Sequence, residues 1–116
     1  MDLHELSWRS VDGLPGVAMA ALADAPVPER IRVDLALIEP GASLPRHPAG
    51  RAQTFAVVSG TGRVAGPDDV AVPIGPGWAA TWQPGEDHTS WADTAMTVLI
   101  IQRSPLGAPE SLADPE

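Results

Sequence analysis

Cysteine and lysine are both missing from the sequence. It contains no cysteine, which excludes disulfides, thiolate metal ligands and cysteine nucleophiles. It also contains no lysine, and its 7 basic residues are arginines scattered along a chain whose formal net charge is −8. Nucleic acids and anionic membrane surfaces are both recognised by clustered positive charge. The sequence therefore predicts neither kind of partner.

Long apolar runs and nucleotide-binding motifs are missing as well. No stretch approaches the roughly 18 apolar residues that a membrane span needs. The opening segment MDLHELSWRS carries acidic residues and no apolar core of a secretory signal, so we expect a cytoplasmic protein. No phosphate loop or dinucleotide fingerprint is present, so no nucleotide cofactor is predicted.

Proline and glycine, in contrast, are plentiful. The 13 prolines and 11 glycines divide 116 residues into short segments and leave little room for sustained helical periodicity. Residues 31–38 alternate with period two, which predicts a half-buried strand that gathers one apolar row on one face: Ile31, Val33, Leu35 and Leu37. Roughly nine or ten such short strands, separated by turn signals, predict an all-β sandwich or small barrel.

The length and the composition along the chain predict one domain in three parts. Residues 1–30 are expected to form an N-terminal arm and a first strand. Residues 31–102 hold the strands of the barrel, of which 94–102 is the most apolar. Residues 103–116 are rich in proline and acidic side chains, which predicts a flexible tail.

Two histidines lie beside turns in distant parts of the chain. His47 stands between two prolines, and His88 follows a Pro-Gly turn. The stretches around them resemble the two motifs of the cupin family. The residues that match in type and spacing are Gly41, His47 and Gly60 in the first motif and Gly77, Pro84, Gly85 and His88 in the second.

The resemblance covers about residues 31–102 and implies an all-β jelly-roll barrel, the double-stranded β-helix of the cupins. Many cupins bind one divalent metal (iron, manganese, nickel or zinc) through three histidines and a glutamate. Here Ala49 replaces the second histidine, and Gln53 replaces the glutamate. The resemblance thus implies a reduced metal site of His47, Gln53 and His88, which lacks the anionic ligand.

Three interpretations of this site stay open at the level of sequence. In the first, the three residues bind a metal, and Glu86 supplies a carboxylate because it lies two residues before His88. In the second, the metal has been lost and the same side chains hold an organic ligand by hydrogen bonds or acid–base chemistry. In the third, the barrel is structural or regulatory, and the histidines are polar groups of its core.

Other side chains are candidates for contact with a ligand. Phe55 and Val57 share the strand face of Gln53 and are expected to form an apolar wall of the site. Trp82 is a candidate for stacking on a planar ligand, although core packing is the favoured interpretation of this tryptophan. Arg51 precedes Gln53 in a turn, where its planar guanidinium could pair with a carboxylate.

The sequence as a whole therefore predicts a small cupin that binds a small organic molecule, through a divalent metal on the reduced ligand set or, alternatively, as a metal-free, non-catalytic binding protein or sensor. Enzymatic activity is left open; the resemblance allows a dioxygenase, an isomerase or a lyase. A homodimer is expected from the resemblance and from apolar strands whose outer faces need cover.

Overall fold

A computed structural model of the chain describes residues 1–24 and 27–107, and all regular structure in these residues is β-strand. The all-β prediction is therefore confirmed. None of the described residues forms a helix suited to crossing a membrane. The strands are β1 (Asp2–Glu5), β2 (Trp8–Ser10), β3 (Ala18–Ala20), β4 (Glu29–Ile38), β5 (Ser43–Pro48), β6 (Ala52–Ser59), β7 (Gly62–Ala65), β8 (Val72–Ile74), β9 (Trp78–Trp82), β10 (Asp87–Ala92) and β11 (Met96–Pro105).

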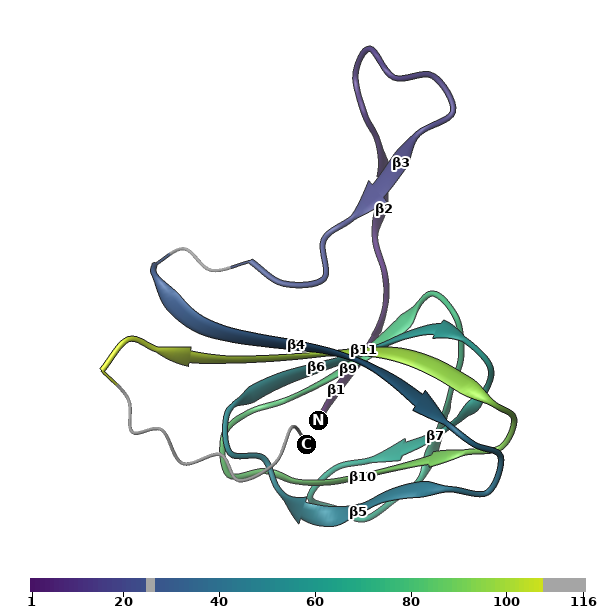
Figure 1. Ribbon diagram of the computed structural model, residues 1–116, viewed down its shortest axis with the longest axis vertical. Coiled ribbons are helices and arrows are strands. Elements are labelled where there is room, and N and C mark those ends of the chain that lie inside the picture. Colours follow the sequence, from purple (N-terminus) through teal and green to yellow (C-terminus); the bar gives the residue numbers. More distant parts are fainter. Residues whose placement is uncertain (25–26, 108–116) are drawn as a thin grey trace.

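The strands form two antiparallel sheets and a separate hairpin. The larger sheet has the order β1-β9-β6-β11-β4, and the smaller has the order β5-β10-β7-β8. Figure 1 shows the two sheets as facing layers, with the β2–β3 hairpin standing away from the outer side of the larger one. This is the predicted jelly roll. The predicted tail is described only as far as residue 107, and β11 continues into it to Pro105.

A glycine of the first motif allows the chain to pass from one sheet to the other. Gly60 lies between β6 and β7 with a backbone φ of 81°, a conformation that residues other than glycine rarely adopt. A Cβ atom at this position would overlap the carbonyl oxygen of Ala95. The turn therefore needs glycine both for its backbone angle and for its close approach to the strand that follows β10.

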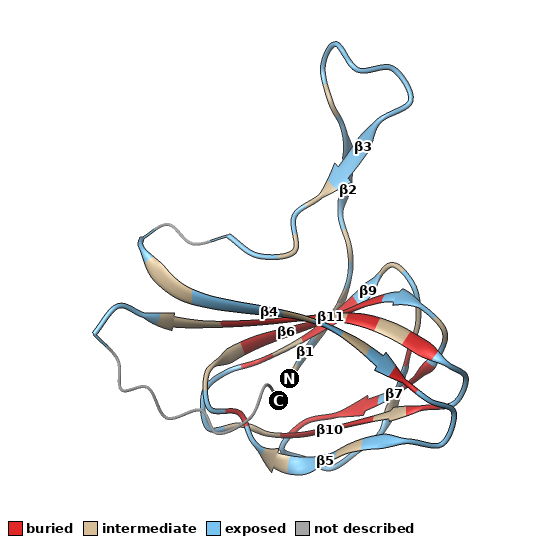
Figure 2. Cartoon of the chain, in the orientation of Figure 1, coloured by how far each residue is buried: buried red, intermediate tan, exposed pale blue. Residues whose placement is uncertain are grey.

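The core fills the space between the sheets. Phe55 and Val57 of β6 face Val98 and Ile100 of β11 in register, and all four are buried. Figure 2 shows the buried positions on the facing layers. Apolar burial of this kind contributes about 25 cal/mol per Å² and is the main source of stability.

β4 differs from the prediction for residues 31–38. The strand forms as expected, but its larger apolar row is exposed, so the expectation of a buried apolar face is wrong for the single chain. The reason is register: Ile38 pairs with Met96 and is buried, and alternation from this point turns the odd-numbered residues outward. Their exposed fractions are 56% for Ile31, 56% for Val33, 64% for Leu35 and 79% for Leu37.

The N-terminal segment first adds an edge strand to the larger sheet and then continues into the separate β2–β3 hairpin. β1 pairs with β9 from Asp2 opposite Thr81 to Glu5 opposite Trp78, so it forms one edge of the larger sheet. β4 forms the opposite edge. The chain between these two edges contains the β2–β3 hairpin, in which Trp8 pairs with Ala20.

Candidate functional site

The two histidines are neighbours on adjacent strands of the smaller sheet. His47 of β5 lies directly opposite His88 of β10, and their ring centroids are 4.4 Å apart at an interplanar angle of 55°. His88 is fully buried, and His47 is partly buried. The β10 register against β5 shifts just after this pair, between His88 and Ser90. The structure thus brings together two imidazoles that lie far apart in the sequence.

Carbonyl groups fix the orientation of these rings. The Nδ1 atom of His47 lies 2.7 Å from the carbonyl oxygen of Pro45, and Nδ1 of His88 lies 3.4 Å from that of Glu86. A carbonyl oxygen only accepts hydrogen bonds, so each neutral ring carries its proton on Nδ1. Nε2 then keeps its lone pair, which is the form that accepts a hydrogen bond or binds a metal.

Trp82, on the larger sheet, packs against His88 of the smaller one. It ends β9, is 1% exposed, and its ring centroid lies 4.8 Å from that of His88 at an angle of 31°. Phe55 meets the indole edge-on, with a centroid distance of 6.2 Å. The Nε1 atom of Trp82 is buried without a hydrogen-bond partner among residues 1–24 and 27–107. Trp82 is therefore a packing residue that also holds a buried donor.

Two buried amides complete this part of the interior. Gln53 of β6 lies opposite Trp82 of β9 on one side and opposite Gln102 of β11 on the other. Both glutamines are almost completely buried, and they share strand faces with core residues of β6 and β11. We call this cluster the polar end of the core; it consists of His47, Gln53, Trp82, His88 and Gln102.

Gln102 was not among the residues predicted from the sequence. A signal for it exists: residues 98, 100 and 102 alternate along β11, so Gln102 is a polar side chain that follows apolar residues on the inward row. Glutamine is seldom buried unless its amide is needed. A polar residue in the inward register of the most apolar strand would have pointed to the site.

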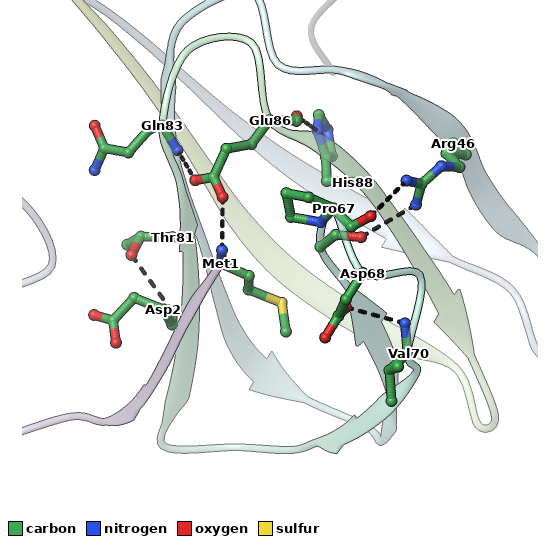
Figure 3. A network of polar contacts seen from close by, with 11 residues as sticks. Met1, Asp2, Arg46, Pro67, Asp68, Val70, Thr81, Gln83, Glu86 and His88 are labelled. Carbon is green, nitrogen blue, oxygen red and sulfur yellow. Dashed lines mark hydrogen bonds and ion pairs between the residues drawn. The ribbon is translucent and has the colours of Figure 1, made fainter.

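Glu86 is held away from the imidazoles. Its Oε1 accepts a hydrogen bond from the backbone N–H of Gln83 at 2.6 Å, and its Oε2 lies 2.8 Å from the α-amino group of Met1 (Figure 3). The Gln83 N–H first and the Met1 ammonium second hold the pKa of Glu86 below its usual range, against a smaller opposing effect of burial. In this arrangement the carboxylate links β1 to the turn before β10.

The donor set lacks two ligands of the four-ligand metal site that many cupins have, because Ala49 and Gln53 stand where a histidine and a glutamate are expected. Ala49 is buried where a histidine would be needed, and its backbone bonds Glu86 and Gly85 across the turn. In the part of the chain that the structure describes, no three histidine, cysteine or acidic side chains group to hold a metal. The remaining donors, two imidazoles and the Gln53 amide, bring no negative charge to a cation.

The other predicted ligand contacts take different places. Phe55 and Val57 lie in the core beyond the polar end, on the face that sequence parity predicts. Arg51 is partly buried in the bend between β5 and β6. Whether these three residues touch a ligand stays a prediction.

Arg46 has a structural role on the rim beside His47. Its Nη1 atom donates to the carbonyl oxygen of Gly66 at 3.1 Å, and Nη2 donates to that of Pro67 at 3.1 Å (Figure 3). The guanidinium also lies 3.2 Å from the carboxylate of Asp69, whose φ is 59°. Arg46 therefore fastens the turn after β7 onto β5, the strand that carries His47.

Comparison with known proteins places the chain in a family. The cupin domain matches residues 34–102, which is more than half of the sequence, and the chain belongs to the cupin family. This confirms the resemblance drawn from the two motifs. No curated protein matches the chain.

Solved structures share the fold at low sequence identity. An RmlC-like cupin from Shewanella frigidimarina is 19% identical with a TM-score of 0.60, over 66% of this chain and 68% of its own. A DMSP lyase from Ruegeria pomeroyi is 18% identical with a TM-score of 0.60, over 74% of this chain and 44% of its own. A salicylate 1,2-dioxygenase from Pseudoaminobacter salicylatoxidans, in complex with gentisate, is 15% identical with a TM-score of 0.57, over 62% of this chain and 20% of its own. These similarities describe the barrel, not its chemistry.

Proposed function

We propose that the protein binds a small organic molecule at the polar end of its core. The observation that carries this proposal is the Nε1 donor of Trp82, which is buried without a hydrogen-bond partner in the described residues. A buried donor without an acceptor costs about 1–3 kcal/mol, so native proteins rarely keep one without a use. A bound molecule with an acceptor oxygen would satisfy it.

The surrounding groups define the class of ligand. The imidazoles of His47 and His88 and the amides of Gln53 and Gln102 give this end of the core its polar character, whereas Phe55 contributes an aromatic edge. These groups suit a small, partly apolar molecule with a carbonyl or hydroxyl oxygen. The net charge of −8 disfavours anions, and Arg51 is the predicted partner of a ligand carboxylate.

Structural neighbours support the class of function without fixing the ligand. The DMSP lyase and the dioxygenase with gentisate act on or bind small organic molecules within the same fold. Our proposal is one of binding and includes no catalytic step, because the fold alone does not transfer a reaction.

A divalent metal on His47, Gln53 and His88 is the second candidate. The cross-strand pairing of the two histidines favours it, because two imidazoles at opposed register positions can serve one cation. Since the set contains no carboxylate, we expect any such cation to exchange readily and to be removed by a mild chelator.

Trp82→Phe tests the proposal directly, because it keeps a ring against His88 and removes the N–H. A panel of small carbonyl and hydroxyl compounds is screened by thermal shift in the presence of a chelator. We expect hits to raise the melting temperature of the wild type. Their affinity should fall about fivefold in Trp82→Phe, equivalent to one hydrogen bond of about 1 kcal/mol.

Trp91→Phe is the matched control. Trp91 lies on the same sheet as the histidines but pairs its ring with the guanidinium of Arg63, 5.2 Å from the centroid, on the outer side. Its replacement should leave ligand affinity unchanged. Equal affinity in Trp82→Phe and the wild type would overturn the proposed site.

Metal analysis separates the two candidates. Elemental mass spectrometry on protein purified without chelator is compared with a His47→Ala/His88→Ala double variant. About one metal per chain in the wild type and none in the variant would favour the second candidate. Ligand binding that is unchanged by chelator would favour the first.

A further inference from the structure

One strand differs from its neighbours in the side chain that follows the polar end of the core. Four strands continue inward with an apolar residue that belongs to the core or packs against it: Leu44 on β5, Phe55 on β6, Ala80 on β9 and Ile100 on β11. On β10, the inward position that follows His88 is occupied by Ser90. A hydroxyl group therefore stands among the apolar side chains of this layer.

Strand pairing places the Ser90 side chain inside the barrel. Ser90 lies opposite Leu44 of β5 and opposite Val64 of β7, and both of these side chains pack in the core. Trp91, the next residue, faces the other side of the sheet, where its ring contacts the guanidinium of Arg63. Ser90 itself is 1% exposed. Its hydroxyl is thus enclosed between the two sheets.

Within residues 1–24 and 27–107, the buried Oγ atom of Ser90 has no hydrogen-bond partner. Such a hydroxyl lowers stability, and alanine, which occupies the next inward position as Ala92, would fill similar space without that cost. A trapped water explains it poorly, because a buried water needs about two to four polar partners and the register neighbours of Ser90 are apolar. The hydroxyl therefore calls for a partner from outside the chain.

Ser90 lies one step along the barrel from the unpartnered Nε1 donor of Trp82. The rings of Trp82 and His88 are in contact, with centroids 4.8 Å apart, and Ser90 follows His88 on the same strand face at a distance of about 7 Å. The strands of these two rings continue inward with the small side chains of Ala80 and Ser90. Both unpartnered groups therefore lie in one part of the interior, where the neighbouring side chains have the least bulk.

We propose that Ser90 is a second anchor of the ligand site, and that the ligand is a small molecule with oxygen functions at both ends of an apolar body. One oxygen accepts a hydrogen bond from Nε1 of Trp82, and the other forms a hydrogen bond with Oγ of Ser90. Leu44 and Phe55 flank the apolar body. The inference rests on the proposed function and adds to it the polarity of the ligand, because a molecule with one oxygen would satisfy only one of the two groups.

Ser90→Ala is first tested without any ligand. Because the substitution removes a hydroxyl that has no partner in the described residues, we expect the melting temperature of the unliganded protein to stay the same or to rise. Thr89→Val is the matched control. Thr89 is also buried and its Oγ1 also lacks a partner in the described part of the chain, but alternation places it on the outer face of the sheet.

Matched probes then test the contact by isothermal titration calorimetry in the presence of a chelator. Cyclohexanone is compared with 4-hydroxycyclohexanone, and acetophenone with 4-hydroxyacetophenone. We expect the hydroxylated member of a pair to bind the wild type about fivefold more tightly, equivalent to about 1 kcal/mol. Ser90→Ala should abolish this advantage, and Thr89→Val should retain it. Trp82→Phe should weaken both members alike, because both carry the carbonyl oxygen.

Three results would overturn the inference. A Ser90→Ala variant that fails to fold, or that melts at a lower temperature without ligand, would mean that the hydroxyl stabilises the fold. Paired probes that bind the wild type equally, or not at all, would exclude the second oxygen. An advantage that Ser90→Ala leaves intact would place the contact elsewhere. The proposed function fails separately, through binding that does not depend on Trp82, and a hydroxyl advantage lost in Ser90→Ala would then still support the second anchor.

Discussion

β4 and β11 are the two longest strands, ten residues each, and they pair along their entire length. β4 alternates between apolar and other residues and exposes its apolar row, whereas β11 is apolar at four consecutive positions, 98–101, and buries Val98 and Ile100. The difference arises from register, since β4 places Ala36 and Asp34 opposite Val98 and Ile100 and carries its larger apolar residues on the outer face of the sheet. Alternation identifies a strand, and its neighbours decide which face meets water.

The largest expected effect on stability distinguishes two isoleucines, one on each strand. Ile100 of β11 is 3% exposed and Ile31 of β4 is 56% exposed. Ile100→Ala should lower the free energy of unfolding by about 3 kcal/mol, because it leaves a cavity between the sheets. Ile31→Ala should change it by less than about 0.5 kcal/mol.

Urea unfolding measures both effects. A comparable loss of stability for the two variants would show that β4 buries its apolar row within the single chain, contrary to the structure.

An effect of intermediate size concerns Glu86, whose ion pair with Met1 is largely shielded from solvent. Glu86→Gln should lower the free energy of unfolding at neutral pH by about 1 kcal/mol. Because the folded-state pKa is lowered, this stabilisation is complete above the usual glutamate pKa and is lost as pH falls through the lowered value. The wild type and the variant should converge in acid.

Thermal unfolding across that pH range provides the measurement. Glu39→Gln, at an exposed position beyond the end of β4, is the control and should change stability little at any pH. A difference between Glu86→Gln and the wild type that grows in acid would contradict the assigned sign.

The smallest effect is expected for the ion pair on β4 itself. Arg32 and Asp34 are 49% and 31% exposed, and solvent screens their attraction. Arg32→Ala should change the free energy of unfolding by less than about 0.5 kcal/mol, and added salt should reduce even that. A larger loss in urea unfolding would mean that the pair orders the edge strand.

The sequence was a good guide wherever local spacing determines the outcome. The two motifs predicted the barrel, and Gly60 stands where the chain has no space for a side chain. The sequence was a poor guide where distant segments decide. The exposure of the apolar row of β4 depends on its pairing with β11, and the position of the Glu86 carboxylate depends on a terminus 85 residues away. Neither contact leaves a local pattern.

The order of strands in the larger sheet also determines when it can be completed. Within this sheet, β1 pairs only with β9 and β4 only with β11. Both edge strands therefore pair with strands that are synthesised much later. Contacts of such high sequence separation slow folding. During synthesis, the apolar row of β4 leaves the ribosome some sixty residues before its partner strand. The backbone of nascent β4 therefore has no partner strand in this sheet until β11 has been synthesised.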